Sequence, residues 1–374
     1  MFKEKNIRGL ARRGELELNH GKIQTPFFMP IATRGAVKTL SSDDMHDLGA
    51  QILLSNTYHL LLRPGREGMK KLGGLHKFMN WSGPLLTDSG GYQVFSLSKM
   101  NKIEEDGVSF RSQLDGSKIK LTPAGSMAMQ SAIGADIIMQ FDDVAAGNST
   151  KERYKDAMER SLRWAKECKD SYDQSQKLFG IVQGGTFEDL REESALGLID
   201  IDFDGYAIGG LSVGESRESA FAIAKRVCEI LPEDKPRYFM GGGMPEEIVY
   251  YVSIGVDMFD CVLPTRNARH GTLFLWKEDP VTAVERAFEL AQDGASDTMI
   301  AEALYRKVQI TKSEFEFDTS KIDAFSDAET SNRYTKAYLR HLFKTQEMLG
   351  SRLASQQNLR YYLRLMAELR RVLS

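Results

Sequence analysis

Two aspartates stand where an apolar segment gives way to small or polar residues. Asp88 lies in LLTDSGG and Asp260 in DMFDCV. A pair of carboxylates around an apolar-walled pocket can divide into an ionised nucleophile and a partner that carries a proton, which is the chemistry of glycosidic bond cleavage through a covalent intermediate. Asp260 is the candidate nucleophile. Asp88 precedes Ser89, Gly90 and Gly91, whose small size lets backbone N–H groups approach a ligand closely, although such residues are also ordinary turn formers.

Further polar positions could together recognise the edge of a flat heterocycle. The carboxylate of Asp142 can accept hydrogen bonds from adjacent N–H groups of a purine, while the amide of Gln183 and the backbone N–H of Gly210 can donate to a carbonyl oxygen. This set fits guanine better than adenine. Tyr92 and Met240 could cover the two faces of the ring. The alternatives stay open here: Asp142 could cap a helix, and Tyr92 and Met240 could belong to the core.

The glycine-rich segments do not match nucleotide-cofactor motifs. GGLSVG at 209–214 lacks the spacing of a dinucleotide-binding loop, and neither it nor GGGMPEE at 241–247 carries the Lys-Ser/Thr of a phosphate-binding loop. His59 and His270 are isolated, and no His pair has metal-ligand spacing. The dispersed cysteines are Cys168, Cys228 and Cys261. These residues predict neither a nucleotide cofactor nor a metal.

The candidate residues follow short apolar segments that are typical of β-strands. Stretches with helical spacing separate several of them, and such alternation predicts a parallel sheet. The eight segments are Met29–Thr33, Ile52–Ser55, Pro84–Thr87, Asp136–Phe141, Leu178–Val182, Tyr206–Ile208, Arg237–Met240 and Val256–Phe259. Eight units of this length predict an α/β fold with a (β/α)8 barrel, in which residues after the strands converge on the C-terminal rim. A doubly wound open sheet is the rival.

The pattern divides the chain into successive parts. Residues 1–276 are the predicted barrel catalytic domain. Residues 277–330 are predicted to hold a helical insertion, with helices at 281–292 and 296–307, and then an acidic loop. Residues 331–374 have an almost wholly helical pattern and are expected to pack on the barrel as a basic C-terminal subdomain.

The composition is that of a globular protein with an uneven charge distribution. The chain has 374 residues, 42% hydrophobic and 27% charged, with a net charge of −3, which excludes a disordered or collagen-like chain. Residues 331–374, in which we expect a helical break near Gly350, carry nine Lys and Arg against two Glu. This asymmetry suggests a site for a polyanion. The arginines that we expect to hold it are Arg360, Arg364, Arg370 and Arg371.

No part of the sequence has the apolar character of a membrane segment. It contains neither a run of eighteen apolar residues nor an apolar stretch near its beginning, so we expect no membrane span and no signal peptide. Together with the dispersed cysteines, this pattern predicts a cytoplasmic protein.

Several long motifs resemble those of the bacterial type of tRNA-guanine transglycosylase. Among them are TDSGGYQVFSLS at 87–98, GIVQGGTFEDLR at 180–191, DGYAIGGLSVGES at 204–216, KPRYFMGGGMPEEI at 235–248 and GVDMFDCVLPTRNARHG at 255–271. The resemblance implies a (β/α)8 barrel enzyme that exchanges the guanine at the wobble position of tRNA anticodons for a 7-deazaguanine base. It also implies a homodimer.

The resemblance implies a role for each matched residue. Asp260 would attack ribose C1′, and Asp88 would act as general acid and base. The base would be read by Asp142, Gln183 and Gly210. The base pocket would be lined by Ser89, Gly90, Gly91, Tyr92 and Met240. The RNA would be contacted by Gly241, Gly242, Gly243, Met244, Pro245, Glu246 and Glu247 and by Thr265, Arg266, Asn267, Ala268 and Arg269.

The chain departs from the family pattern at a zinc site. Where the family has cysteine ligands, this chain has Ser326, Ala328 and Ser331, and of the ligand set only His341 remains. Three thiolates cannot be supplied here, so we expect no zinc. A helical insertion at 278–309 is expected to pack on the C-terminal helices near His341 and to take over the stabilising role of the metal.

Different classes of function compete for this pattern. The leading hypothesis is a catalytically competent base-exchange enzyme that acts on tRNA. The alternatives are a non-catalytic tRNA-binding paralogue or subunit of the same fold, and the same exchange on another nucleic acid. The presence of both Asp88 and Asp260 favours the enzyme, because a binding protein has no need for two carboxylates desolvated in one pocket. Which 7-deazaguanine base is used stays open.

Overall fold

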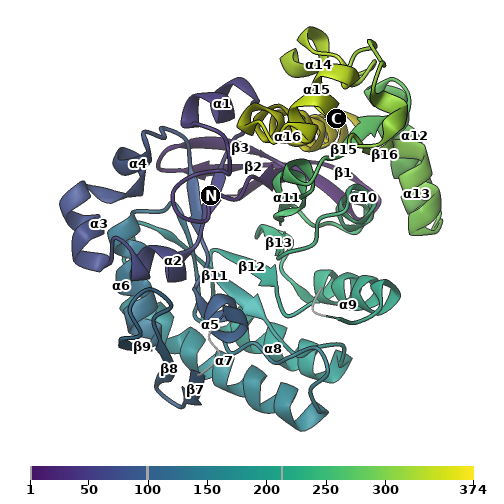
Figure 1. The fold of residues 1–374 in the computed structure, drawn as a ribbon. Helices are drawn as coiled ribbons and strands as arrows, with labels where there is room; N and C mark the ends of the chain where they lie inside the picture. Colours follow the sequence, from purple (N-terminus) through teal and green to yellow (C-terminus); the bar gives the residue numbers. More distant parts are fainter. Residues whose placement is uncertain (1, 98–100, 212–213) are drawn as a thin grey trace.

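A closed barrel of parallel strands forms the body of the protein (Figure 1). The computed structural model describes residues 2–97, 101–211 and 214–374. Within these ranges, eight strands follow one another in the order β4-β14-β13-β12-β11-β10-β6-β5, and a parallel bridge between Ile31 and Leu54 closes the ring. The predicted (β/α)8 barrel is confirmed, and the alternative of an open sheet is wrong.

The barrel strands lie at the apolar segments of the sequence. They are β4 (Phe27–Met29), β5 (Leu53–Ser55), β6 (Leu85–Thr87), β10 (Ile137–Met139), β11 (Lys177–Val182), β12 (Gly205–Ile208), β13 (Arg237–Phe239) and β14 (Met258–Asp260). The first predicted segment, Met29–Thr33, is displaced, because β4 already ends at Met29. Pro30 follows it and has no N–H for a longer ladder.

Helices and a small sheet connect the strands on the outside of the barrel. The connecting elements are α1 (Ser42–Asp47), α2 (Thr57–Leu62), α3 (Arg66–Leu72), α4 (Gly74–Met79), α5 (Gly91–Leu97), β7 (Asn101–Glu104), β8 (Gly107–Arg111), β9 (Lys118–Leu121), α6 (Pro123–Ile133), α7 (Lys151–Ser171), α8 (Glu188–Ile201), α9 (Arg217–Ile230), α10 (Pro245–Ser253) and α11 (Leu263–Arg269). Capping residues determine where several of these helices begin and end. Helix α6 begins after Thr122, whose hydroxyl accepts from the N–H of Gly125, and ends at Gly134, which has a φ of 76°.

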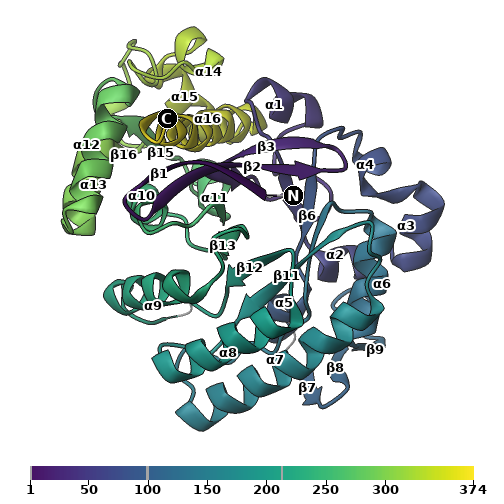
Figure 2. The same cartoon turned by 180° about the vertical axis from the view of Figure 1, so that it is seen from behind.

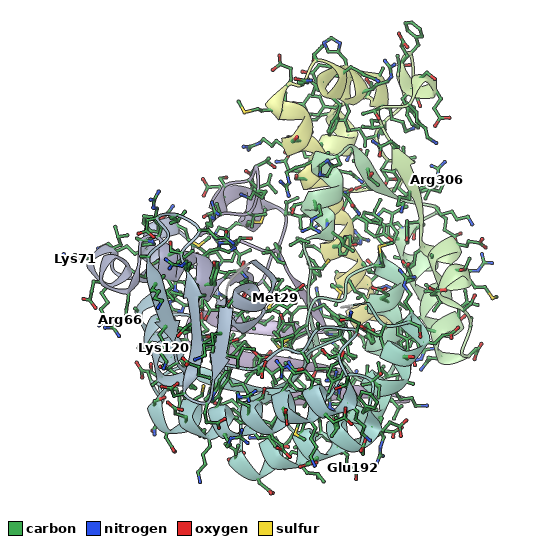
Figure 3. The ribbon with its side chains drawn as sticks, turned by 60° about the horizontal axis from the view of Figure 1, so that its bottom comes forward. Met29, Arg66, Lys71, Lys120, Glu192 and Arg306 are labelled. Carbon is green, nitrogen blue, oxygen red and sulfur yellow. The ribbon has the colours of Figure 1, made fainter. Side chains whose placement is uncertain are left out.

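An antiparallel sheet that the sequence analysis missed covers the N-terminal end of the barrel (Figure 2). It consists of β1 (Phe2–Arg8), β2 (Ala11–Leu18) and β3 (Gly21–Thr25). Phe2, Leu16 and Ile23 share one buried cluster with inward-facing barrel residues such as Met29, which lies in the middle of the molecule in Figure 3. The barrel interior is therefore filled from this end, and its functional face is the opposite rim.

The insertion is a helical hairpin between two paired strands. Strands β15 (Thr272–Trp276) and β16 (Tyr305–Gln309) are antiparallel, and α12 (Pro280–Gln292) and α13 (Asp297–Leu304) connect them. The helix predicted over 296–307 is thus too long, because residues from Tyr305 onward pair with the edge of β15. The hairpin packs on α10 of the barrel and on the C-terminal helix, whereas His341 lies exposed on another helix, so the predicted location beside His341 is wrong.

The C-terminal region is divided into more helices than predicted. It comprises the 3-10 turn η1 (Ser313–Phe315), α14 (Glu329–Arg333), α15 (Lys336–Lys344) and α16 (Met348–Val372). The break falls at Gln346, whose φ of 59° is left-handed, and not at Gly350, which is buried inside the first turn of α16. Helix α16 then lies along the barrel beside α11 and β15.

The arginines of α16 are paired within the protein. Arg360 and Arg364 both donate to Asp327, and Arg364 and Arg371 both donate to Glu368. Arg370 donates to the carbonyl of Pro26 at 2.7 Å, and burial lowers its pKa to about 10. Asp327 connects Arg360 and Arg364 with the loop before α14, whereas the pairs with Glu368 lie within α16 itself. The expected binding of a polyanion by these arginines stays a prediction, although much of their charge has partners inside the chain.

Among the described residues, no helix combines the length and the apolar character that a membrane span requires.

Asn358 gives a stability test of the contact between α16 and the barrel. Its buried side chain accepts from the N–H of Phe274 and donates to the carbonyls of Pro264 and Thr272. Replacing Asn358 with Leu leaves these backbone groups unpaired, so the free energy of unfolding in urea should fall by about 3 kcal/mol. Arg352→Ala on the same helix removes only the half-exposed partner of Asp44, which keeps the hydrogen bonds from Gln356 and Ser41, so it should cost less than about 1 kcal/mol. Equal losses would contradict this explanation.

Candidate active site

Buried carboxylates gather at the C-terminal rim of the barrel. Asp88 follows β6, Asp142 follows β10, and Asp260 ends β14, and each side chain is almost fully buried. Burial of a carboxylate raises its pKa because the charged form loses hydration. The surrounding hydrogen-bond donors therefore decide which of these groups stays ionised.

Asp88 is held by the segment that follows β5. Its carboxylate accepts from the side-chain amide of Asn56 and from the N–H of Thr57 at 2.8 Å, and its own carbonyl accepts from the Thr57 hydroxyl at 2.6 Å. The pKa of Asp88 is raised to about 7. Burial is the main cause and the charge of Asp260 adds to it, while the donated hydrogen bonds partly oppose the shift. Asp88 is thus poised to gain or lose a proton near neutral pH.

Asp260 is anchored through one of its two oxygens. Oδ1 accepts from the hydroxyl of Tyr238 at 2.5 Å and from the N–H of Gly241 at 3.0 Å. Burial raises the pKa of Asp260, and these donors lower it in part. Tyr238 is itself buried, and the charges of both Asp260 and Asp88 raise its pKa, which places its hydroxyl within electrostatic reach of both carboxylates.

The predicted base-reading residues meet one another. Asp142 accepts from the Ser89 hydroxyl at 3.0 Å through Oδ1 and from the Gln183 amide at 2.7 Å through Oδ2. Burial raises the pKa of Asp142 to about 6, against the effect of these bonds. A Cβ on Gly210, which has a φ of 63°, would overlap the Gln183 amide, so glycine is required there.

Residues of other loops surround Asp142 and its neighbours. Gly91 lies so close to Asp142 that a Cβ there would overlap its carbonyl, and Gly90 has a φ of 86°. Met240 follows β13 and reaches Gly209, the neighbour of Gly210. The ring of Tyr92 is 49% exposed, which excludes the alternative that it belongs to the core.

Hydrogen bonds inside the chain hold the segment 241–247 in place. Glu247 caps α10 by accepting from the N–H groups of Gly243 and Met244 at 3.2 and 3.0 Å. Glu246 is buried and accepts from the Tyr305 hydroxyl at 2.9 Å. The carboxylates predicted to touch RNA are thus engaged inside the chain, while the backbone of this segment lies beside Asp260 through Gly241.

The second predicted RNA segment lies on α11, which follows β14. Arg266 is exposed, and Asn267 and Arg269 are half-buried, so these side chains can reach a ligand at the rim. Thr265 and Ala268 face the interior and support the helix.

Sequence reasoning gave no role to Asn56, Thr57 or Tyr238. The sequence does place Asn56 at the rim, because it follows a predicted strand in the same way as Asp88, but the pattern gives it no chemical role. Thr57 binds Asp88 through its backbone N–H, which has no residue-type signal. Tyr238 lies inside β13, where it has the pattern of an ordinary core residue.

One group of potential metal ligands occurs among the described residues, and it lies at the opposite end of the barrel. It consists of His20, His76 and Asp136. The carboxylate lies 2.9 Å from His20 Nδ1 and 3.5 Å from His76 Nε2, and the imidazole rings stack in parallel with centroids 3.6 Å apart. Parallel rings direct their lone pairs side by side and not toward one point. We interpret this group as a hydrogen-bonded cluster that fastens the β2–β3 turn to the barrel.

Comparison with known proteins identifies the family. The family model described as queuine tRNA-ribosyltransferase matches residues 7–374. The chain belongs to this family. Proteins named queuine tRNA-ribosyltransferase from Tolumonas auensis and Actinobacillus pleuropneumoniae are each 48% identical to it, over 99% and 100% of this chain and 92% of each relative. One from Vibrio cholerae is 46% identical over 100% of the chain and 92% of its own length.

The residues at the zinc position of the family do not fit a metal. Ala328 offers no ligand atom, and the hydroxyl of Ser331 donates to the Gln357 amide. Gln357 in turn donates to Asp323, which also accepts from the N–H of Trp276 at 2.9 Å. The side chain that faces Ser331 is thus Gln357, and naming His341 as the remaining member of this site was wrong. Direct hydrogen bonds connect the acidic loop with α16 here.

The raised pKa of Asp88 predicts a pH dependence of stability. The folded state holds a proton that the unfolded state releases from about pH 4 upward, so this group lowers the stability progressively as the pH rises to about 7. Asp88→Asn removes this loss, so its stability relative to wild type, measured in urea, should be greater at pH 8 than at pH 5. Asp170→Asn, at an exposed position of α7, should show a constant difference. A constant difference for the Asp88 variant too would contradict the assignment.

Proposed function

We propose that this chain exchanges the guanine at the wobble position of tRNA for a 7-deazaguanine base, with Asp260 as nucleophile and Asp88 as proton carrier. Membership in the queuine tRNA-ribosyltransferase family supports the reaction class. The observation that carries the residue roles is the pair of buried, electrostatically coupled carboxylates at the open rim. A radiolabelled-guanine exchange assay with unmodified tRNA tests the activity directly.

The anchoring of Asp260 suggests which oxygen reacts. Since Tyr238 and Gly241 both donate to Oδ1, we assign the attack to Oδ2. Oδ2 forms an ester bond with ribose C1′ while the bond from C1′ to N9 of guanine breaks and its electron pair stays on the base. The same donors then hold the ester in place until the incoming base attacks C1′.

Asp88 supplies the proton in one half of the exchange and recovers it in the other. The protonated acid gives its proton to the departing guanine, and the resulting carboxylate takes the N9 proton of the incoming base. A pKa of about 7 suits both directions near neutral pH. The donors Asn56 and Thr57 hold the carboxylate in one orientation throughout.

Base recognition follows from the geometry of the reading residues. Asp142 would accept from the N1–H and 2-amino groups of guanine, and Gln183 and Gly210 would donate to its O6. Gln183 donates to Asp142 Oδ2, so a base that binds this oxygen would have to replace the hydrogen bond from Gln183. Tyr92 and Met240 would cover the ring faces, since the Tyr92 ring is half exposed at the rim.

The nucleic acid must present its base as a flipped nucleotide. A base in a stacked helix cannot reach carboxylates that are almost fully buried, whereas a splayed base of an anticodon loop can. We propose that the backbone of 241–243 and the side chains of Arg266, Asn267 and Arg269 hold the neighbouring nucleotides. A homodimer is proposed from the family resemblance. No specific feature of the site favours the non-catalytic alternative.

Asp260→Asn is the decisive variant for the covalent step. An amide cannot form the glycosyl ester, so guanine exchange should be abolished while the fold and tRNA binding persist. A protein–RNA adduct that survives denaturation should form with wild type and with Asp170→Asn, and should be absent from the Asp260 variant. Normal exchange by Asp260→Asn would refute the nucleophile assignment.

We further propose that the chain works without zinc. Hydrogen bonds from Ser331 and Gln357 already connect the loop to α16, so a strong chelator should change neither the melting temperature nor the exchange rate. Elemental analysis of purified protein, with recovery of added zinc as its control, should give far less than one zinc per chain. One tightly held zinc per chain, or loss of activity with the chelator, would contradict this proposal.

A further inference from the structure

Arg191 is a fully buried cation behind the base-reading residues. It lies in the first turns of α8, and burial lowers the pKa of its guanidinium to about 9, although the nearby Glu215 and Tyr154 raise it. The next residue, Glu192, lies on the outer side of the same helix, where it pairs with Arg226 at 3.0 Å (Figure 3). A buried guanidinium is unfavourable unless its N–H groups are satisfied by hydrogen bonds.

The guanidinium is bound by carbonyl oxygens of two neighbouring loops. Nε donates to Gly185 at 2.7 Å, and Nη1 donates to both Val182 and Gly209 at 2.7 Å. Val182 is the last residue of β11 and Gly209 directly follows β12. One planar group therefore joins the C-terminal ends of two adjacent barrel strands.

The three residues that carry these carbonyls are close in sequence to the residues that would receive the base. Val182 precedes Gln183, and Gly209 precedes Gly210. Ser194, one turn further along α8, accepts from the N–H of Gln183 at 3.0 Å. Both loops turn at glycines, because Gly185 and Gly210 have φ values of 61° and 63°. Glycine restricts the backbone least, so the hydrogen bonds from Arg191 add a constraint that these turns do not supply themselves.

We propose that Arg191, assisted by Ser194, positions the Gln183 amide and the Gly210 N–H to receive the carbonyl oxygen of the purine, and so determines the specificity for an oxygen at that position. This inference rests on the proposed function. Nη1 of Arg191 binds the carbonyls of both loops while Nε holds Gly185, and the single nitrogen of a lysine cannot take both positions at once. Arg191 does not touch the base and acts through the loops as a positioning residue.

A positioning role and a purely structural role of Arg191 predict different effects of its substitution. A loss of folded protein lowers the activity toward every base equally. A displacement of the loops weakens only the interaction with the carbonyl oxygen. Guanine and 2-aminopurine separate the two cases. Both carry the 2-amino group, and 2-aminopurine lacks both the N1–H from which Asp142 would accept and the oxygen that Gln183 and Gly210 would receive. Asp142 is unchanged in every variant tested, so its share of the preference for guanine stays constant and a change in the ratio reports on the oxygen.

The experiment measures the inhibition of labelled-guanine exchange by unlabelled guanine and by 2-aminopurine. In wild type, guanine should bind far more tightly than 2-aminopurine. In Arg191→Lys, the ratio of the two inhibition constants should fall by roughly tenfold, through weaker guanine binding, which is the effect of one buried hydrogen bond. Ser194→Ala, a smaller change that keeps the cation, should lower the same ratio less, and it provides the test if the lysine variant does not fold.

A matched control comes from a second buried arginine far from this site. Arg237 donates to the carbonyl of Leu231 at 2.9 Å, at the beginning of β13, so Arg237→Lys can lower stability but should leave the ratio unchanged. A wild-type chain without guanine exchange would refute the proposed function itself. A normal exchange reaction with an unchanged ratio in the folded Arg191 and Ser194 variants would overturn the positioning role alone.

Discussion

The burial of Asp88, Asp142 and Asp260 in one pocket is the constraint on which the other features of the rim depend. Each carboxylate would be protonated or displaced toward water if its surroundings were apolar, because burial raises each pKa. The structure opposes this with fixed donors from several strand ends. A barrel suits this task, since its parallel strands bring distant parts of the sequence to one rim while the packed interior keeps them still.

The barrel itself could be predicted because its strands are apolar segments with polar residues after them. The same rule found Asp88, Asp142, Gln183 and Asp260, which all follow strands. It could not find the sheet of β1 to β3, because β1 is charged along most of its length and buries only Phe2. Strand β16 was read as helix for a related reason: its pairing with β15 is a tertiary contact that local periodicity does not show.

The residues that sequence reasoning missed act on partners distant in the chain. Tyr238 and Arg191 have the pattern of core residues, and only the fold reveals that one donates to Asp260 and the other joins two loops. The charge of the C-terminal helix is a second feature that the sequence alone does not explain. A local excess of arginine suggested a surface for a polyanion, yet Asp327 and Glu368 take up much of that charge within the molecule. Net charge counts do not distinguish internal pairing from an external field.

The sheet at the N-terminal end of the barrel has a consequence for the order of events in catalysis. Since Phe2, Leu16 and Ile23 fill that end, both bases must pass through the rim, where the nucleic acid is also attached. Under the proposed recognition, Asp142 and Gln183 bind the edge of one base and so serve one base at a time. Departure of the first base would then precede arrival of the second, with the ribose held as the ester in between. The proposed mechanism on this architecture leads to ping-pong kinetics, in which the two bases compete for one form of the enzyme.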